Sequence, residues 1–134
     1  MISWLRIGVL ALVASFSMSA PPSAQDDDPL AALQQNCTSG DMTACNALGG
    51  RLYNGNGVAA DRTRAIEYFS IGCDGDYRTS CRNLGILFAT GTDADKDMAR
   101  SAEYYAKACD LGEAYSCGRL GELYFDGEGV AQDR

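Results

Sequence analysis

Six cysteines at regular spacing are the residues of this chain with the most distinctive chemistry. They stand at positions 37, 45, 73, 81, 109 and 117, so they form three pairs, 8 positions apart within a pair and 36 apart between pairs. Paired thiols can form disulfides, bind zinc or take part in thiol–disulfide exchange. Two periods kept in register three times indicate a repeat protein in which each repeat carries its own pair.

The short separation within each pair favours a disulfide across a turn. On one continuous helix, residues 8 apart would lie about 12 Å apart along the axis, too far for a disulfide. The segments between paired cysteines contain glycine and aspartate, which break helices. Of the 15 connectivities that six cysteines allow, we therefore predict Cys37–Cys45, Cys73–Cys81 and Cys109–Cys117.

The first 24 residues have the layout of a secretory signal peptide. A start that carries Arg6 is followed by an apolar run over 7–16, and then by small residues and prolines up to Ala24. The run is too short to span a bilayer, and no cysteine near Ala24 offers a lipid anchor. We predict cleavage after Ala24 and a periplasmic or secreted protein, which suits disulfides.

Composition narrows the class of function. The chain has 11 basic and 18 acidic side chains, and loss of Arg6 with the signal peptide changes the net charge from −7 to −8. An acidic chain without a basic stripe argues against binding to nucleic acid or to anionic membranes.

There is no histidine, and the Ser-x-x-Lys, Ser-Asp-Asn and Lys-Thr-Gly motifs of serine β-lactamases are missing. We expect no catalytic residue, no cofactor and no metal.

Superposition at a shift of 36 predicts two helices in each repeat. The first runs from just before the second cysteine of a pair to an aromatic residue, contains a Leu-Gly pair suited to close helix packing, and ends at a glycine loop. The second is capped by an aspartate and ends at the next cysteine. The positions are Leu48-Gly49, Leu84-Gly85 and Leu120-Gly121; Tyr53, Phe88 and Tyr124; Gly55, Gly91 and Gly127; and Asp61, Asp97 and Asp133.

Three details complete this prediction. Asp28-Pro29 is expected to open the first helix as N-cap and first helical residue. The middle repeat has Gly91-Thr92-Asp93-Ala94 in place of Gly-x-Gly-Val, so its loop should differ in shape. The tyrosines and phenylalanines at helical spacing are expected to form the core between helices, not a ligand site.

The repeat motif is similar to that of a known family. Leu120-Gly121, Tyr124, Gly127-Glu128-Gly129-Val130 and Asp133, with the helix over 101–109, resemble the SEL-1-like repeat. The cysteine pairs resemble its cysteine-rich branch, typified by the Helicobacter cysteine-rich proteins. The resemblance implies a tetratricopeptide-like α/α superhelical solenoid of about two and a half 36-residue repeats, and mostly protein–protein scaffolding. For some cysteine-rich members it also implies penicillin binding or weak β-lactam hydrolysis.

The expected domain organisation follows from these segments. A signal peptide occupies 1–24, an acidic lead-in 25–28 and the repeat domain 29–134. In such solenoids the first helices line the concave side, where polar side chains could hydrogen-bond an extended peptide or a carboxylate. The alternative for each is an ordinary solvated side chain. The candidate groove residues are Asn46, Arg51, Arg82, Asn83, Arg119 and Glu122.

Three functions remain open at this point. The favoured one is an exported module that binds a protein or peptide of unknown identity. The second is a β-lactam or cell-wall-fragment binder with at most weak β-lactamase activity. The third is a redox protein, although nothing obvious near the cysteines lowers the thiol pKa. A calcium loop beginning at Asp93, Asp95 and Asp97 is disfavoured, because Met98 and Tyr104 stand where it needs glycine and glutamate.

The end of the sequence raises a separate expectation. Arg134 follows Asp133, the residue expected to cap a further helix. The apolar stripe of the preceding helix would then lack a covering helix. This stripe carries Leu120, Leu123, Tyr124 and Phe125. Either the reading frame is truncated, or a second copy of the chain or a partner covers this stripe.

Overall fold

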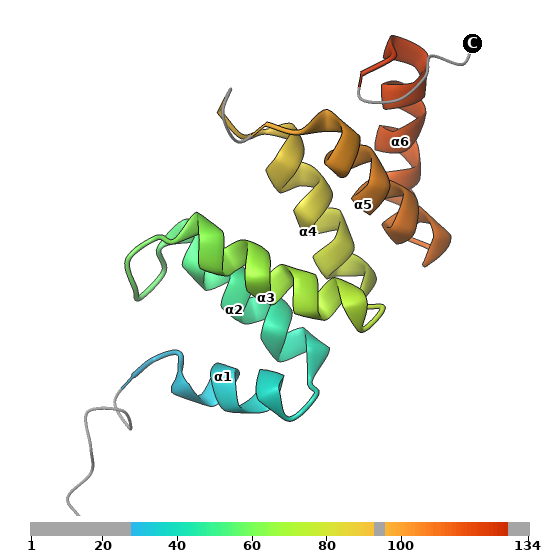
Figure 1. Ribbon diagram of the computed structural model, residues 1–134. Coiled ribbons are helices and arrows are strands. Elements are labelled where there is room, and N and C mark those ends of the chain that lie inside the picture. The colour runs from blue at the N-terminus through green and yellow to red at the C-terminus, as the bar shows by residue number, and fades with distance from the viewer. Residues whose placement is uncertain (1–27, 93–95, 129–134) are drawn as a thin grey trace, which may run out of the picture.

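The protein is an α-helical solenoid in the part of the chain that its computed structural model describes, residues 28–92 and 96–128. The six helices within these ranges stack in sequence order from one end of the molecule to the other (Figure 1), and these ranges contain no strand. This arrangement confirms the predicted fold class. The helices are α1 (Ala31–Thr38), α2 (Met42–Asn54), α3 (Arg62–Asp74), α4 (Arg78–Ala89), α5 (Met98–Asp110) and α6 (Ala114–Asp126).

Disulfides join successive helices at every other turn. Cys37–Cys45 links α1 to α2, Cys73–Cys81 links α3 to α4, and Cys109–Cys117 links α5 to α6. Each pair has a Cα–Cα separation of 4.7 Å, which the antiparallel turn between its helices allows. The described repeats are therefore stapled in the way that the cysteine spacing predicts.

Helix ends follow the predicted aspartates and glycines. Asp61 and Asp97 cap α3 and α5, because each carboxylate accepts a backbone N–H three residues on, at 3.1 and 3.0 Å. Gly55 and Gly127 close α2 and α6 with φ of 74° and 75°, a left-handed backbone that glycine adopts without strain. The middle repeat differs, as predicted, since α4 closes on Thr90 with φ of −108°.

The expected start of the first helix is wrong by two residues. Its first helical residue is Ala31, and Leu30 occupies the cap position without a side-chain hydrogen bond. The Asp28 carboxylate accepts the N–H of Leu30 at 2.9 Å, and the Asp28 carbonyl accepts the N–H of Ala31 at 3.0 Å. Aspartate that bonds the backbone two residues on favours a turn, so 28–30 form a turn before α1.

At the first two Leu-Gly pairs, a side chain of the repeat's second helix packs closely against the glycine of the first. A Cβ added to Gly49 would come within 2.7 Å of the Phe69 ring, and one added to Gly85 within 2.6 Å of the Tyr105 ring. Both rings are buried, at 4% and 1% exposure. Glycine therefore lets an aromatic residue of α3 or α5 lie directly on the backbone of α2 or α4.

The expectation that the aromatic residues form the core is only partly right. Phe69, Phe88 and Tyr105 are buried, but Tyr53 is 42% exposed. Tyr53 stands one position beyond the register of Phe88, and the buried Leu52 occupies the aligned position. The Tyr53 ring therefore lies at the surface and not in the core. Three further exposed aromatics are Tyr115, Tyr124 and Phe125, all on α6.

Two predictions concern segments at or beyond the limits of this structure. The proposed signal peptide, 1–24, and the end of the glycine loop after α6 lie outside the described residues. Among the helices that are described, none has the length and apolar character needed to cross a membrane.

Candidate functional site

The helices α2, α4 and α6 carry all six of the predicted groove residues. Between α2 and α4, Asn83 Nδ2 donates a hydrogen bond to Asn46 Oδ1 at 2.9 Å. The hydroxyl of Ser80, which is fully buried, donates to the same oxygen at 3.0 Å. The structure thus brings Asn46 and Asn83 together, with Ser80 as a partner that sequence reasoning did not single out.

A second polar cluster lies between α4 and α6. Arg82 of α4 pairs with Glu113, the N-cap residue of α6, at 3.6 Å between Nη1 and Oε1. Glu113 also accepts the backbone N–H and the hydroxyl of Ser116, at 2.8 and 2.6 Å. Burial by itself would raise the Glu113 pKa, but the two hydrogen bonds from Ser116 and the charge of Arg82 together hold it below its usual value.

Sequence reasoning missed Glu113, although a signal for it exists. Asp41, Tyr77 and Glu113 stand 36 positions apart, just before the first helix of each repeat. Acidic residues at this position favour the N-terminus of a helix. The repeat alignment could therefore have identified Glu113 as a cap, and the cap geometry then aims one of its oxygens at Arg82.

Of the three remaining candidate groove residues, Arg119 and Glu122 lie on α6 and Arg51 lies on α2. Arg119 pairs with Glu122 one turn along α6, and it lies near the hydroxyl of buried Tyr105. Arg51 is exposed, and within the described ranges no hydrogen bond or ion pair joins it to the other five. It stands in register with Leu87, which is buried. The structure therefore does not bring Arg51 into either polar cluster.

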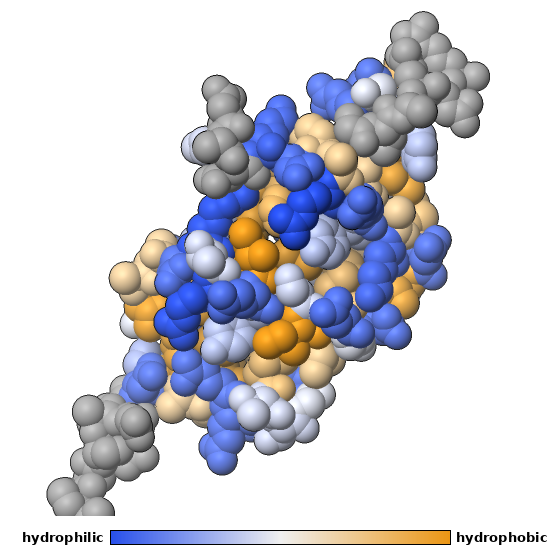
Figure 2. Space-filling model, viewed as in Figure 1, coloured by the Kyte–Doolittle hydropathy of each residue, from blue (hydrophilic) through white to orange (hydrophobic). Residues whose placement is uncertain are grey.

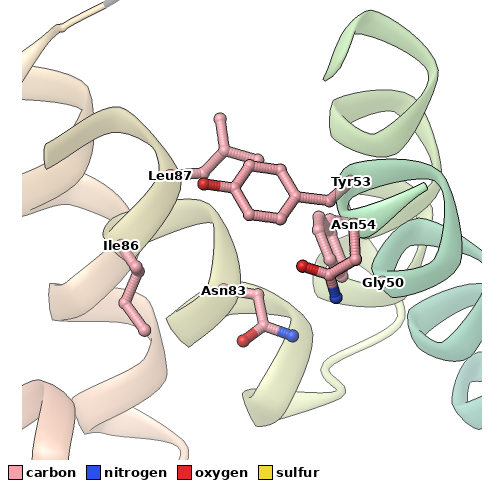
Figure 3. A pocket seen from close by; sticks show the side chains of 7 residues that line it. Gly50, Tyr53, Asn54, Asn83, Ile86 and Leu87 are labelled. Carbon is pink, nitrogen blue, oxygen red and sulfur yellow. The ribbon is translucent and has the colours of Figure 1, made fainter. Parts of the chain in front are cut away.

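A pocket of about 240 Å³ lies between α2 and α4, next to the Asn46–Asn83 pair. Figure 3 shows the Tyr53 ring reaching from α2 towards Leu87 of α4, while the amides of Asn54 and Asn83 face the space below it. Because Tyr53 and Asn54 are exposed, the pocket opens to the surface. Its lining residues are Gly50, Tyr53, Asn54, Phe69, Asn83, Ile86 and Leu87.

The sequence contains two signals for this pocket that the groove prediction did not use. Gly50 holds the repeat position of Ile86 and Glu122, so α2 lacks a side chain there. Tyr53 is displaced by one residue from the aligned aromatic position. Of the predicted groove residues, only Asn83 lines the pocket.

The arrangement is suited to binding by hydrogen bonds and apolar contact. In the described part of the chain, no three His, Cys, Asp or Glu residues are placed to hold a metal ion. Asp97 of the disfavoured calcium loop caps α5, while Asp93 and Asp95 lie outside the described residues. Figure 2 shows apolar residues at the surface in the middle of one face of the solenoid, with hydrophilic residues around them.

Comparisons with known proteins agree with this architecture. The structure of a Sel1 repeat protein from Oxalobacter formigenes is 32% identical, with a TM-score of 0.68 over 78% of this chain and 79% of that one. The protein c5321, a protective antigen of uropathogenic Escherichia coli with an SLR fold, is 31% identical, with a TM-score of 0.72 over 78% of this chain and 22% of that one. Helicobacter pylori cysteine-rich protein B is 27% identical, with a TM-score of 0.57 over 78% and 80% of the two chains.

Comparison with curated proteins gave no match. The family model described as Sel1 repeat matches residues 43–77, 79–113 and 114–134, which together make up more than half of the sequence. The first two segments coincide with the helix pairs α2–α3 and α4–α5, and the third begins at α6. The match confirms the resemblance drawn from the repeat motif. The chain belongs to the Sel1 repeat family.

Proposed function

We propose that this protein is an exported interaction module that binds a protein or peptide on a concave face formed by α2, α4 and α6. The observation that carries the proposal is the gathering of polar side chains from these helices beside an open pocket. The Asn46–Asn83 pair and the Arg82–Glu113 pair lie on adjacent steps of the solenoid. Family membership supports a scaffold, since Sel1 repeats generally serve protein interaction.

The same residues argue against the β-lactam alternative. The described polar groups are hydrogen-bonded amides, ion pairs and helix caps. Where a hydroxyl lies beside a carboxylate, as Ser116 does beside Glu113, the pair belongs to a helix cap, and the Ser116 side chain is fully buried. Serine β-lactamase motifs are missing from the sequence. Nothing in the site therefore favours that alternative over an interaction scaffold.

Export is supported by two independent features. Three structural disulfides are typical of proteins in oxidising compartments. The layout of residues 1–24 is that of a secretory signal peptide. The mass of protein purified after secretory expression tests this part. A start near Gln25 and six hydrogens fewer than in the reduced chain are expected, whereas free thiols or an intact N-terminus would contradict export.

A pair of matched variants tests the binding face. Arg82→Gln alters the proposed face on α4, and Arg64→Gln removes the same charge from an exposed position on α3. Proteins captured from a cell-envelope extract are identified, and their affinities for purified wild type and both variants are compared. We expect at least about tenfold weaker binding for Arg82→Gln and no change for Arg64→Gln. Equal binding by all three proteins, with unchanged melting temperatures, would place the partner elsewhere.

A further inference from the structure

The pocket between α2 and α4 arises from departures of this repeat from its own register. The next repeat has Ile86 where α2 has Gly50, and a Cβ added at Gly50 would meet nothing within 4 Å. The ring of Tyr53, displaced by one residue from the core position, forms one wall of the space that Gly50 leaves open. These two departures therefore account for the hollow at the α2–α4 step of the solenoid.

The size of the pocket limits what can occupy it. Its volume is about 240 Å³. An apolar protein cavity of about 150 Å³ accommodates benzene, whereas pockets for drug-sized ligands and cofactors range from roughly 300 to 1,000 Å³. A single side chain of the size of leucine or phenylalanine therefore fits the volume of this pocket better than a cofactor does.

The lining also limits the charge of the occupant. None of the seven lining residues is Asp, Glu, Lys or Arg, and burying a charge without a partner is costly. The apolar part comes from Phe69, Ile86 and Leu87, together with the ring of Tyr53. An uncharged apolar group is therefore the favoured occupant.

Two amides supply the polar part of the lining. The Asn83 side chain donates one amide hydrogen to Asn46. Its carbonyl oxygen and its second amide hydrogen have no hydrogen-bond partner among the described residues. The side chain of Asn54 likewise has no hydrogen-bond partner in this part of the chain. A side-chain amide presents both a donor and an acceptor, as a peptide bond does, so the two amides can pair with the backbone of an extended peptide.

We propose that this pocket holds one uncharged leucine- to phenylalanine-sized side chain of an extended peptide, while Asn54 and Asn83 hydrogen-bond the peptide backbone beside it. The inference rests on the proposed interaction function and adds the class of side chain that is recognised. A peptide bound in this way would continue along α4 towards Arg82 and Glu113, the next polar pair on the solenoid.

Small amino-acid amides test the pocket without knowledge of the natural partner. The oxidised protein, labelled with ¹⁵N, is titrated with N-acetyl-leucinamide, N-acetyl-phenylalaninamide and N-acetyl-lysinamide, and the amide resonances of Gly50, Asn54 and Asn83 are followed. The two apolar amides are expected to shift these resonances saturably, with at least about tenfold higher affinity than the lysine compound.

Two glycine variants provide a matched comparison. Gly50→Leu fills the pocket, while Gly118→Leu places the same side chain on α6, where an added Cβ also meets nothing within 4 Å. We expect Gly50→Leu to weaken binding of the apolar amides at least about tenfold, and Gly118→Leu to leave it unchanged. Tyr53→Ala removes an exposed wall of the pocket and should weaken binding as well.

The outcomes separate this inference from the proposed function. Absence of saturable shifts in the wild type, or equal binding by Gly50→Leu, would overturn the pocket assignment even if a partner binds elsewhere on the face. Binding of toluene as tight as that of N-acetyl-phenylalaninamide would overturn the backbone role of Asn54 and Asn83. A natural partner that is insensitive to Arg82→Gln would contradict the proposed function while the pocket result stands.

Discussion

Asn83 donates a hydrogen bond to Asn46 across 37 positions of sequence, and this bond joins the first helices of two successive repeats. The next step of the solenoid has Arg82 and Arg119 at the equivalent two positions. Two cations cannot pair directly, and each is instead paired with a carboxylate, Glu113 or Glu122. The polar surface of the solenoid thus changes from neutral amides at α2 and α4 to ion pairs at α4 and α6.

The amide pair makes a testable contribution to stability. Asn46→Ala removes the acceptor of both Asn83 and the fully buried Ser80 hydroxyl. A buried donor left without a partner costs about 1–3 kcal/mol, so the free energy of unfolding should fall by about that amount. Urea denaturation followed by circular dichroism measures the change.

A double-mutant cycle identifies the cause of this loss. Ser80→Ala removes the orphaned hydroxyl, so the double variant Asn46→Ala/Ser80→Ala should lose about 0.5–1.5 kcal/mol less than the sum of the two single variants. Strict additivity would show that the hydrogen bond between Ser80 and Asn46 contributes nothing to the coupling.

The glycine of the Leu-Gly pair should be intolerant of substitution only where a ring covers it. Gly85→Ala would place a Cβ 2.6 Å from the Tyr105 ring, which is buried and cannot move away freely. Overpacking of this kind costs about 1–3 kcal/mol. Gly121→Ala is the matched control, because the equivalent Cβ meets nothing within 4 Å. It should be neutral or up to about 1 kcal/mol stabilising. Equal destabilisation of both variants would contradict the packing argument.

Local and covalent features of the fold could be predicted from the sequence. The disulfide pairs follow from the spacing of cysteines around a short turn, and the caps at Asp61 and Asp97 depend on hydrogen bonds to residues three positions away. Such features need no knowledge of how distant helices pack. The one failure among them, the start of α1, came from the preference of Asp28 for a local turn.

The pocket could not be predicted in the same way, because it depends on side-chain register between helices. The displacement of Tyr53 by one residue rotates its ring by about 100° around α2, and only the packed position of α4 shows that Leu87 lies opposite. Arg51, which stays a prediction as a groove residue, shows the same dependence on register. It is polar, but it occupies the position that points to the core in the next repeat, where Leu87 is buried.

The central disulfide should contribute more to stability than the last one. Closing a loop of this length stabilises by roughly 2.5 kcal/mol on chain-entropy grounds, and this contribution is the same for the two bridges. Cys73 and Cys81 are also buried, at 1% and 0% exposure, whereas Cys117 is exposed. Cys73→Ala/Cys81→Ala should therefore lose about 1 kcal/mol more than Cys109→Ala/Cys117→Ala, through the loss of packing.

Urea midpoints of the two double variants measure this difference. The slopes of the transitions should be compared first, because removal of a cross-link also changes the surface that unfolding exposes. Equal losses for the two bridges would show that the buried sulfur atoms of the central pair add nothing to the entropic constraint.

The Glu113 carboxylate should make stability depend on pH in one direction. Burial tends to raise its pKa, but hydrogen bonds from Ser116 and the charge of Arg82 hold the folded-state pKa below the usual value of 4.5. The unfolded chain therefore takes up the proton first as pH falls, and the stabilisation is complete above about pH 4.5 and is lost as pH falls through the folded-state pKa. Glu113→Gln should be less stable than wild type at pH 7, and the gap should close in acid. Thermal or urea unfolding between pH 3 and 7 measures the gap.

Glu103→Gln, at an exposed position on α5, is the control and should change stability at pH 7 by less than about 0.5 kcal/mol. A gap between wild type and Glu113→Gln that stays constant down to pH 3 would show that the carboxylate charge does not stabilise the cap.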